Sequence, residues 1–295
     1  MKMNKVFAAV AAILMGMGVQ AQTTFTPSKD VLTTGVRCGV DSYLLKSNLS
    51  NQSGKIGPAV GLDLNYKRFF TPKVGFVTGI NLTLAHSGLN LSGINAKTES
   101  TIGNKAVVYT YDMSNCKESY TTVFAELPLQ LALQGQRFFG NVGFKLAAPL
   151  YTQGRFDNSG YSVSAYLPQY GTTIAATESQ YGCGTYDGDK GSKDATYAVR
   201  QVYVFAACEV GMHFPNKKYA TRQWGISLYA DYALNRKNVE GNGNPFISVT
   251  GTNPSDVQMT QQLALGSSFI EKVGYLNAGL RLTFDFGEPA QVFGR

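Results

Sequence analysis

Charged side chains recur inside the most apolar stretches of this 295-residue sequence. In FAELPLQLAL, residues 124–133, leucines occupy every second position and Glu126 lies between them. Because side chains along a strand point alternately to opposite faces, this spacing predicts a strand with one apolar face and one face that carries a carboxylate. Carboxylates and cations that face one another in a closed interior can form ion pairs or pass protons. The candidates for this chemistry, all on such polar faces, are Arg37, Asp63, Glu126, Lys145, Glu209, Asp231 and Arg281.

The same alternation of apolar and polar residues recurs along the chain in eight segments. Each has roughly the ten residues that a tilted strand needs to cross a bilayer. The segments are 35–44, 58–68, 74–85, 121–133, 138–151, 201–214, 223–235 and 273–286. A water-soluble β-sandwich would show the same alternation with its apolar faces turned inward, so the alternation alone does not separate the two folds.

The connections between these segments favour one of the two folds. The second, fourth and sixth connections are short, at 70–73, 134–137 and 215–222, whereas the others are long. Short turns at one end and long loops at the other are typical of outer-membrane barrels. We therefore predict an all-β fold, an eight-stranded antiparallel transmembrane β-barrel with long extracellular loops. The alternative is a ten-stranded barrel, in which 161–179 would also cross the membrane.

Side chains are expected to fill the interior of such a barrel, because eight strands enclose little further space. A symmetric turn at 134–137 sets Glu126 opposite Lys145, and the same register sets Leu127 opposite Phe144. We predict that the Glu126–Lys145 pair is the start of an interior charge network. Its further members are expected from Arg37, Asp63, Glu209, Asp231 and Arg281. A polar plug that closes the lumen is favoured over a gated pore or a proton path.

The first 21 residues have the composition of a cleaved secretory signal peptide. Lys2 and Lys5 precede an apolar run that ends in the small-residue motif VQA at 19–21. The sequence therefore predicts a signal peptide at 1–21 and a barrel domain at 22–295, exported to the outer membrane of a Gram-negative bacterium. The formal charge of +7 is spread without basic runs, which argues against nucleic-acid binding.

Two short motifs resemble an exported family of outer-membrane barrels that includes PorT-like proteins. AELPLQLAL at 125–133 resembles the family's LEIPL strand, and LYADYALN at 228–235 resembles its seventh strand. The closing strand NAGLRLTFDF at 277–286 is similar to the signal that the outer-membrane assembly machinery recognises. The resemblance implies an eight-stranded, OmpA-like barrel whose partners are outer-membrane lipid and, during biogenesis, the assembly machinery.

Four cysteines permit three pairings. Cys38 and Cys208 fall on outward faces of the first and sixth strands, which are not neighbours in a ring of eight and so cannot meet. Cys116 and Cys183 fall in predicted outer loops, where the chain could bring them together. We therefore predict a Cys116–Cys183 disulfide, with four free thiols as the alternative.

Tyrosines alternate with glycine and serine in the fifth connection, 152–200, a composition used by adaptable binding surfaces. The candidates for recognition of a surface ligand or a membrane-protein partner are Tyr161, Tyr166, Tyr170, Tyr181 and Tyr186. We favour over recognition the interpretation that 161–168 and 172–179 form a hairpin that extends the barrel wall above the membrane.

His86 and Ser87, at the outer end of the third strand, suggest a lipid-modifying enzyme, since some outer-membrane barrels catalyse such reactions. No glycine-flanked serine or further acid lies at suitable spacing, so we expect no catalytic residue. No Cys/His cluster has zinc spacing, so we expect no metal or cofactor. The favoured function is a non-enzymatic membrane scaffold with a packed lumen that displays its outer loops. A narrow porin or channel and a PorT-like secretion component are the alternatives, and a lipid-modifying enzyme is less favoured.

Overall fold

The computed structural model describes residues 29–47, 52–135, 137–188, 190–215, 222–238 and 245–287. The predicted signal peptide at 1–21 lies outside the described residues. Within these ranges, no helix has the length and hydropathy needed to cross a membrane.

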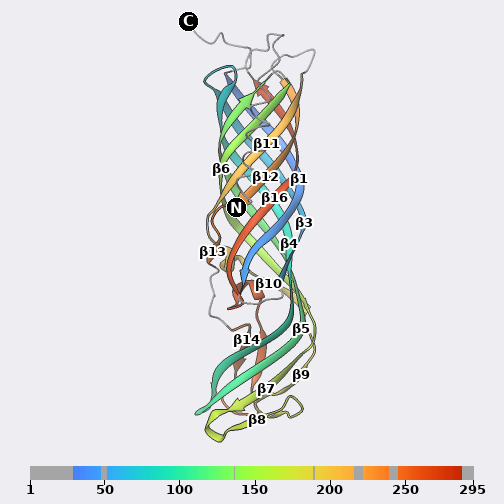
Figure 1. Ribbon diagram of the computed structural model, residues 1–295, viewed down its shortest axis with the longest axis vertical. Coiled ribbons are helices and arrows are strands. Elements are labelled where there is room, and N and C mark those ends of the chain that lie inside the picture. The colour runs from blue at the N-terminus through green and yellow to red at the C-terminus, as the bar shows by residue number, and fades with distance from the viewer. Residues whose placement is uncertain are drawn as a thin grey trace, which may run out of the picture.

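Eight antiparallel strands pair into a closed ring (Figure 1). In order around the ring they are β1 (Asp30–Ser47), β3 (Gly57–Phe69), β4 (Val74–Ile102), β5 (Lys105–Gln134), β6 (Phe138–Asn158), β11 (Tyr203–Pro215), β12 (Arg222–Ala233) and β16 (Ile270–Gly287). The ring closes because β16 pairs with β1 from Val31 opposite Gly287 as far as Ser47 opposite Ile270. The predicted eight-stranded barrel is confirmed.

Two of the short connections are tight turns at the same end of the ring. Between β3 and β4, the Val74 N–H donates to Thr71 Oγ1 at 3.0 Å, and the Phe70 N–H donates to the Val74 carbonyl at 2.9 Å. Between β5 and β6, the Gly135 N–H donates to the Phe138 carbonyl at 2.8 Å. These bonds hold each pair of strands in one register.

The register of the β5–β6 hairpin differs from the prediction by two positions. The turn closes one residue later than one symmetric about 134–137, so Glu126 faces Ala147 and not Lys145. Leu127 faces Leu146 for the same reason. Because the side-chain period of a strand is two, this shift leaves every side chain on its predicted face. The register error changes which residue lies opposite Glu126, but it does not change which side chains face the interior of the barrel.

Two ring strands continue far beyond the predicted membrane segments. β4 has 29 residues and β5 has 30, and they join in a hairpin at Gly103 where a long loop was expected. β7 (Tyr161–Leu167) pairs with β5, and both β8 (Thr172–Ile174) and β9 (Gly184–Tyr186) pair with β7. The predicted extension of the wall is therefore confirmed. The ten-stranded alternative is wrong, because β7 pairs with β5 at 108–113, beyond the ring.

The smaller elements lie around this extension and at its junction with the ring. β10 (Lys190–Asp194) pairs with the outer part of β6, and β2 (Gln52–Lys55) pairs with β4. β14 (Ile247–Thr250) and β15 (Gln258–Gln261) form a separate two-stranded sheet. The others are η1 (Pro168–Tyr170), η2 (Gln180–Gly182), α2 (Thr196–Val199), β13 (Lys237–Asn238) and η3 (Ala264–Gly266).

A hydrophobic core fills the part of the molecule beyond the ring, which we call the outer extension. It consists of the distal halves of β4 and β5 with β7, β8, β9, β14 and β15, and lies at the lower end of Figure 1. Its buried side chains include Leu91, Ile94, Tyr109, Met113, Val163, Phe246 and Leu265. Burial of this apolar surface, at about 25 cal/mol per Å², explains why the strands continue where loops were expected.

Candidate functional site

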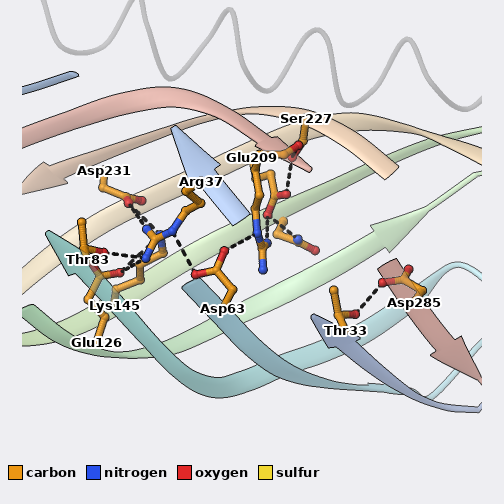
Figure 2. A network of polar contacts seen from close by, with 12 residues as sticks. Thr33, Arg37, Asp63, Thr83, Glu126, Lys145, Glu209, Ser227, Asp231 and Asp285 are labelled. Carbon is orange, nitrogen blue, oxygen red and sulfur yellow. Dashed lines mark hydrogen bonds and ion pairs between the residues drawn. The ribbon is translucent and has the colours of Figure 1, made fainter. Parts of the chain in front are cut away.

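All eight ring strands contribute to one layer of polar side chains inside the barrel (Figure 2). We call it the ionic layer. Its members, from β1 round to β16, are Arg37, Asp63, Thr83, Glu126, Lys145, Glu209, Asp231 and Arg281. The structure thus brings together the seven residues singled out from the sequence and adds Thr83. All are buried, as period-two alternation requires of residues opposite the leucine-rich faces.

Arg37 is the centre of the layer, with 2% of its side chain exposed. Its Nε lies 2.9 Å from Asp63 Oδ1, and its Nη2 lies 2.9 Å from Glu126 Oε2. The same Nη2 donates to Thr83 Oγ1 at 2.7 Å, and Nη1 lies 3.5 Å from Asp231 Oδ2. One guanidinium therefore joins strands from both halves of the chain, as its planar fork of donors allows.

Asp63 holds two arginines together. Arg37 and Arg281 face each other across the β1–β16 ladder, where like charges destabilise a sheet. Asp63, from β3, places Oδ1 2.9 Å from the Arg37 Nε and Oδ2 2.6 Å from the Arg281 Nε. Arg281 also donates through Nη1 to Glu209 Oε2 at 2.8 Å. The carboxylate between the two cations offsets their repulsion.

Lys145 completes the layer from β6. Its Nζ donates to Asp231 Oδ2 at 2.7 Å and lies 3.9 Å from Glu126 Oε2. Glu126 and Lys145 are thus diagonal neighbours in contact, although the ladder does not pair them directly. Glu209 is held in turn by Ser227, whose hydroxyl donates to Oε1 at 2.5 Å.

A second ionic cluster lies nearer the short turns. Lys67 Nζ is 3.2 Å from Asp285 Oδ2, and the Thr33 hydroxyl donates to Asp285 Oδ1 at 2.6 Å. His213 Nδ1 is 3.9 Å from the same carboxylate, and its ring stacks on Phe139 at 4.3 Å. Sequence reasoning did not single out Lys67. Its position on the polar face of 58–68, next to the outward Tyr66, is the signal that could have found it.

The arrangement favours structural ion pairing. The described carboxylates of the ionic layer each contact at least one cation of the layer, and neighbouring hydroxyls and amides satisfy further oxygens. Buried charges are tolerated when they are paired and hydrogen-bonded in this way. Among the residues that the structure describes, no group of His, Cys, Asp and Glu has the geometry to hold a metal ion.

The outer surface of the ring has the opposite character. The side chains that alternate along the strands with those of the ionic layer point outward, and they are apolar and exposed. A surface in contact with water does not usually carry so extensive an apolar patch. The outward side chains include Val36, Leu62, Leu64, Ile80, Leu82, Leu129, Leu131, Phe144, Leu228, Leu280 and Leu282. Aromatic rings border this band at the end with the short turns: Tyr66, Phe70, Phe138, Phe214, Trp224 and Phe286. An apolar band bordered by an aromatic girdle faces lipid. The chain has the fold and the apolar outer surface of an outer-membrane-type β-barrel.

Three solved structures that resemble this chain over most of their length are Ail, the outer membrane protein AlkL and the outer membrane protein OprG. Ail, the attachment invasion locus protein of Yersinia pestis, was solved in complex with the heparin analogue sucrose octasulfate. It is 12% identical to this chain, the alignment covers 86% of this chain and 99% of Ail, and the TM-score is 0.26. AlkL is 12% identical, with 93% and 98% covered and a TM-score of 0.36. OprG from Pseudomonas aeruginosa is 10% identical, with 90% and 100% covered and a TM-score of 0.33. No family model and no curated protein matches the chain.

All four cysteines of the barrel are unpaired. The expected Cys116–Cys183 disulfide is not present. Cys116 lies in β5 and not in a loop, and its thiol contacts Glu118 Oε1 at 3.6 Å. The Cys183 thiol contacts the Ile174 carbonyl at 3.8 Å. Each thiol is therefore buried on a different partner, and Cys116 is fixed in a sheet.

His86 and Ser87 point to opposite faces of β4. Ser87 is buried inside the barrel, whereas His86 faces outward and its Nδ1 lies 3.0 Å from Thr121 Oγ1. The two residues cannot act on one substrate atom from opposite sides of a sheet. The pair on which an enzymatic interpretation would depend is therefore not assembled.

The five tyrosines predicted for recognition divide into two groups. Tyr161, Tyr181 and Tyr186 are packed in the outer extension, where the rings of Tyr161 and Tyr186 stack at 5.1 Å. Tyr166 and Tyr170 are exposed, at 42% and 59%. Lys105 Nζ lies 5.2 Å from the Tyr170 ring. Only these two of the five present a surface that a partner could contact.

A carboxylate anchors the segment that precedes β16 to the inside of the barrel wall. Glu118 of β5 accepts the Ala264 N–H at 2.9 Å and a hydrogen bond from the Tyr120 hydroxyl, which in turn accepts the Leu265 N–H at 3.2 Å. Burial raises the pKa of Glu118 to about 7, although these donors favour its charged form. Sequence reasoning missed this contact, because it joins residues 146 positions apart.

Proposed function

We propose that this protein is a non-enzymatic scaffold of the outer membrane that presents its outer extension to a protein partner or surface ligand. The barrel anchors the chain in lipid, and the ionic layer closes its lumen. The single observation that carries the proposal is that all eight strands contribute a side chain to that layer. A channel would need an open path between these side chains.

The outer extension supports the second half of the proposal. Its hydrophobic core is continuous with buried side chains at the outer end of the ring, so the extension is a packed structure that holds its surface in one shape. Tyrosine supplies a large contact area at low conformational cost, and Tyr166 and Tyr170 are exposed on it. The positively charged Lys105 lies beside Tyr170. A binding surface there would combine aromatic and cationic contacts.

Export completes the proposal. We infer cleavage of a signal peptide after Ala21, so that the mature chain begins at Gln22. The intact mass of the protein purified from outer membranes is expected to match residues 22–295. A mass that includes the first 21 residues would contradict this inference.

Photo-crosslinking in native membranes tests the scaffold function. A photoreactive amino acid at Tyr170 is expected to capture a discrete partner, whereas the same group at the lipid-facing Phe144 is expected to capture lipid only. Identical products from both positions would refute recognition by the outer extension. Secretion proteins among the partners captured at Tyr170 would favour the PorT-like alternative.

A further inference from the structure

A polar groove of about 980 Å³ lies on the outside of the wall, where the ring meets the outer extension. It is lined by side chains from four adjacent strands, β4, β5, β6 and β10, and Figure 1 shows β10 at this junction. The principal lining residues are His86, Ser119, Thr121, Arg155, Asp157 and Lys190. None of them belongs to the ionic layer, which faces the other side of the sheet.

The centre of the groove is an arginine flanked by hydroxyls. Arg155 of β6 lies opposite Ser119 on one side and Ser192 on the other. Its side chain is exposed, and it forms no ion pair with any residue that the structure describes. A guanidinium with hydroxyl donors on both sides matches the oxygens of a phosphate group.

The neighbouring rows of the sheet contain two lysines and two acids. Asp157 lies opposite both Lys117 and Lys190, and its Oδ1 is 3.2 Å from the Lys190 Nζ. Of these three residues only Asp157 and Lys190 line the groove, so together with Arg155 the lining carries one net positive charge. Asp194 lies opposite Gln153 and is engaged by the Thr196 N–H at 2.7 Å, outside the groove lining. The groove as a whole is therefore cationic.

The height of the groove places it at the outer boundary of the lipid. On each of the three ring strands that line the groove, the outward side chain one step toward the membrane is apolar: Leu84 precedes His86 on β4, Val123 follows Thr121 on β5, and Tyr151 precedes Gln153 on β6. Leu84 and Tyr151 are 44% and 47% exposed. A molecule that filled the groove could therefore also lie along the apolar band, which a free anion cannot do.

We propose that this groove binds the phosphorylated headgroup of an outer-leaflet glycolipid, with Arg155 and the flanking serines on the phosphate and the acyl chains against the apolar band. Lys190 adds to the attraction, and Asp157 opposes it. The site rests on the proposed function, in which the barrel lies in the outer membrane with the outer extension facing outward, and is independent of whether that extension has a partner.

Native mass spectrometry, used to measure the binding of lipid A to the detergent-solubilised barrel, tests this site. Bis-phosphorylated lipid A is expected to bind, and its dephosphorylated form roughly tenfold more weakly, as the loss of a charge-assisted contact predicts. Arg155→Gln should weaken binding about tenfold and Lys190→Gln about threefold. Asp157→Asn should strengthen it. Lys97→Gln, a neutralised exposed lysine on the distal part of β4, is the matched control and should leave binding unchanged.

Several outcomes would overturn the proposal. Equal binding of the phosphorylated and dephosphorylated lipids would exclude recognition of the phosphate. Unchanged binding in both Arg155→Gln and Lys190→Gln would exclude this groove, and Lys190→Gln at the exposed β10 remains informative if Arg155→Gln fails to fold. Inorganic phosphate that displaces the lipid at equal concentration would show a site for a free anion, with no contribution from the apolar band.

Discussion

Asp63→Asn removes the one carboxylate that separates two arginines. The Asp63 side chain has no exposed surface and contacts both guanidinium groups within 2.9 Å. Asparagine keeps the shape but replaces one oxygen by an N–H₂ that faces a donor. Loss of one partner from a buried ion pair costs about 3–5 kcal/mol, and here two cations lose the same partner. We expect the free energy of unfolding to fall by an amount near the upper end of that range.

Urea unfolding in phospholipid vesicles measures this loss. The chain has a single tryptophan, Trp224, whose ring lies in the girdle on the lipid-facing surface, so its fluorescence reports insertion. Asp112→Asn, at an exposed acid of the outer extension, is the matched control and should change stability by less than about 0.5 kcal/mol. A loss below about 1 kcal/mol for Asp63→Asn would mean that water solvates the ionic layer, and the structural reasoning would fail.

Three further predictions concern the lumen, the lipid face and the outer mouth. The protein should insert into planar bilayers without conductance steps; discrete steps would show an open path. Leu82→Arg on the lipid face should lower the free energy of unfolding by about 2–4 kcal/mol, whereas Asn95→Arg in the outer extension should hardly change it. Equal effects of the two substitutions on unfolding in vesicles would contradict the assignment of the leucine-rich faces to lipid. The pKa of Glu118 is raised from 4.5 to about 7, so the folded state binds this proton more tightly than the unfolded state does. The contribution of Glu118 to the free energy of unfolding should therefore be fully present below about pH 4.5. It should fall by on the order of 3 kcal/mol as the pH rises to 7. Amide-exchange protection factors at Ala264 should show this fall, and Glu118→Gln should abolish it; a pH-dependence that survives the substitution would assign the effect to another group.

Period-two alternation was sufficient to predict the ring. It specifies which side chains face inward, and the short turns specify which strands are neighbours, so the seven predicted network residues could be grouped before any contact was known. Individual contacts could not be predicted, because alternation fixes a face but not a register. The two-position error at Glu126 arose from a turn whose position no residue in 134–137 specified.

Apart from the predicted hairpin formed by β7 and β8, the outer extension was the main feature that the sequence did not reveal. Polar residues alternate with apolar ones in the distal parts of β4 and β5 as they do in the ring, but the intervening glycines and serines resembled a loop. Its core is assembled from segments as distant as Met113 and Leu263, and a pattern within one segment carries no information about such contacts. The expected disulfide failed for a related reason, since Cys116 was assigned to a loop and lies in a sheet.

Asp63 belongs to neither of the two strands that meet when the ring closes. Arg37 comes from the first of them and Arg281 from the last, and both must reach the same carboxylate on β3. If β16 joined β1 two residues out of step, the ladder would still be complete, but the carboxylate would lose one of its cations. Asp63 on β3 thus favours the native register of closure, because a misaligned closure would leave a buried charge without its partner and so favour reopening.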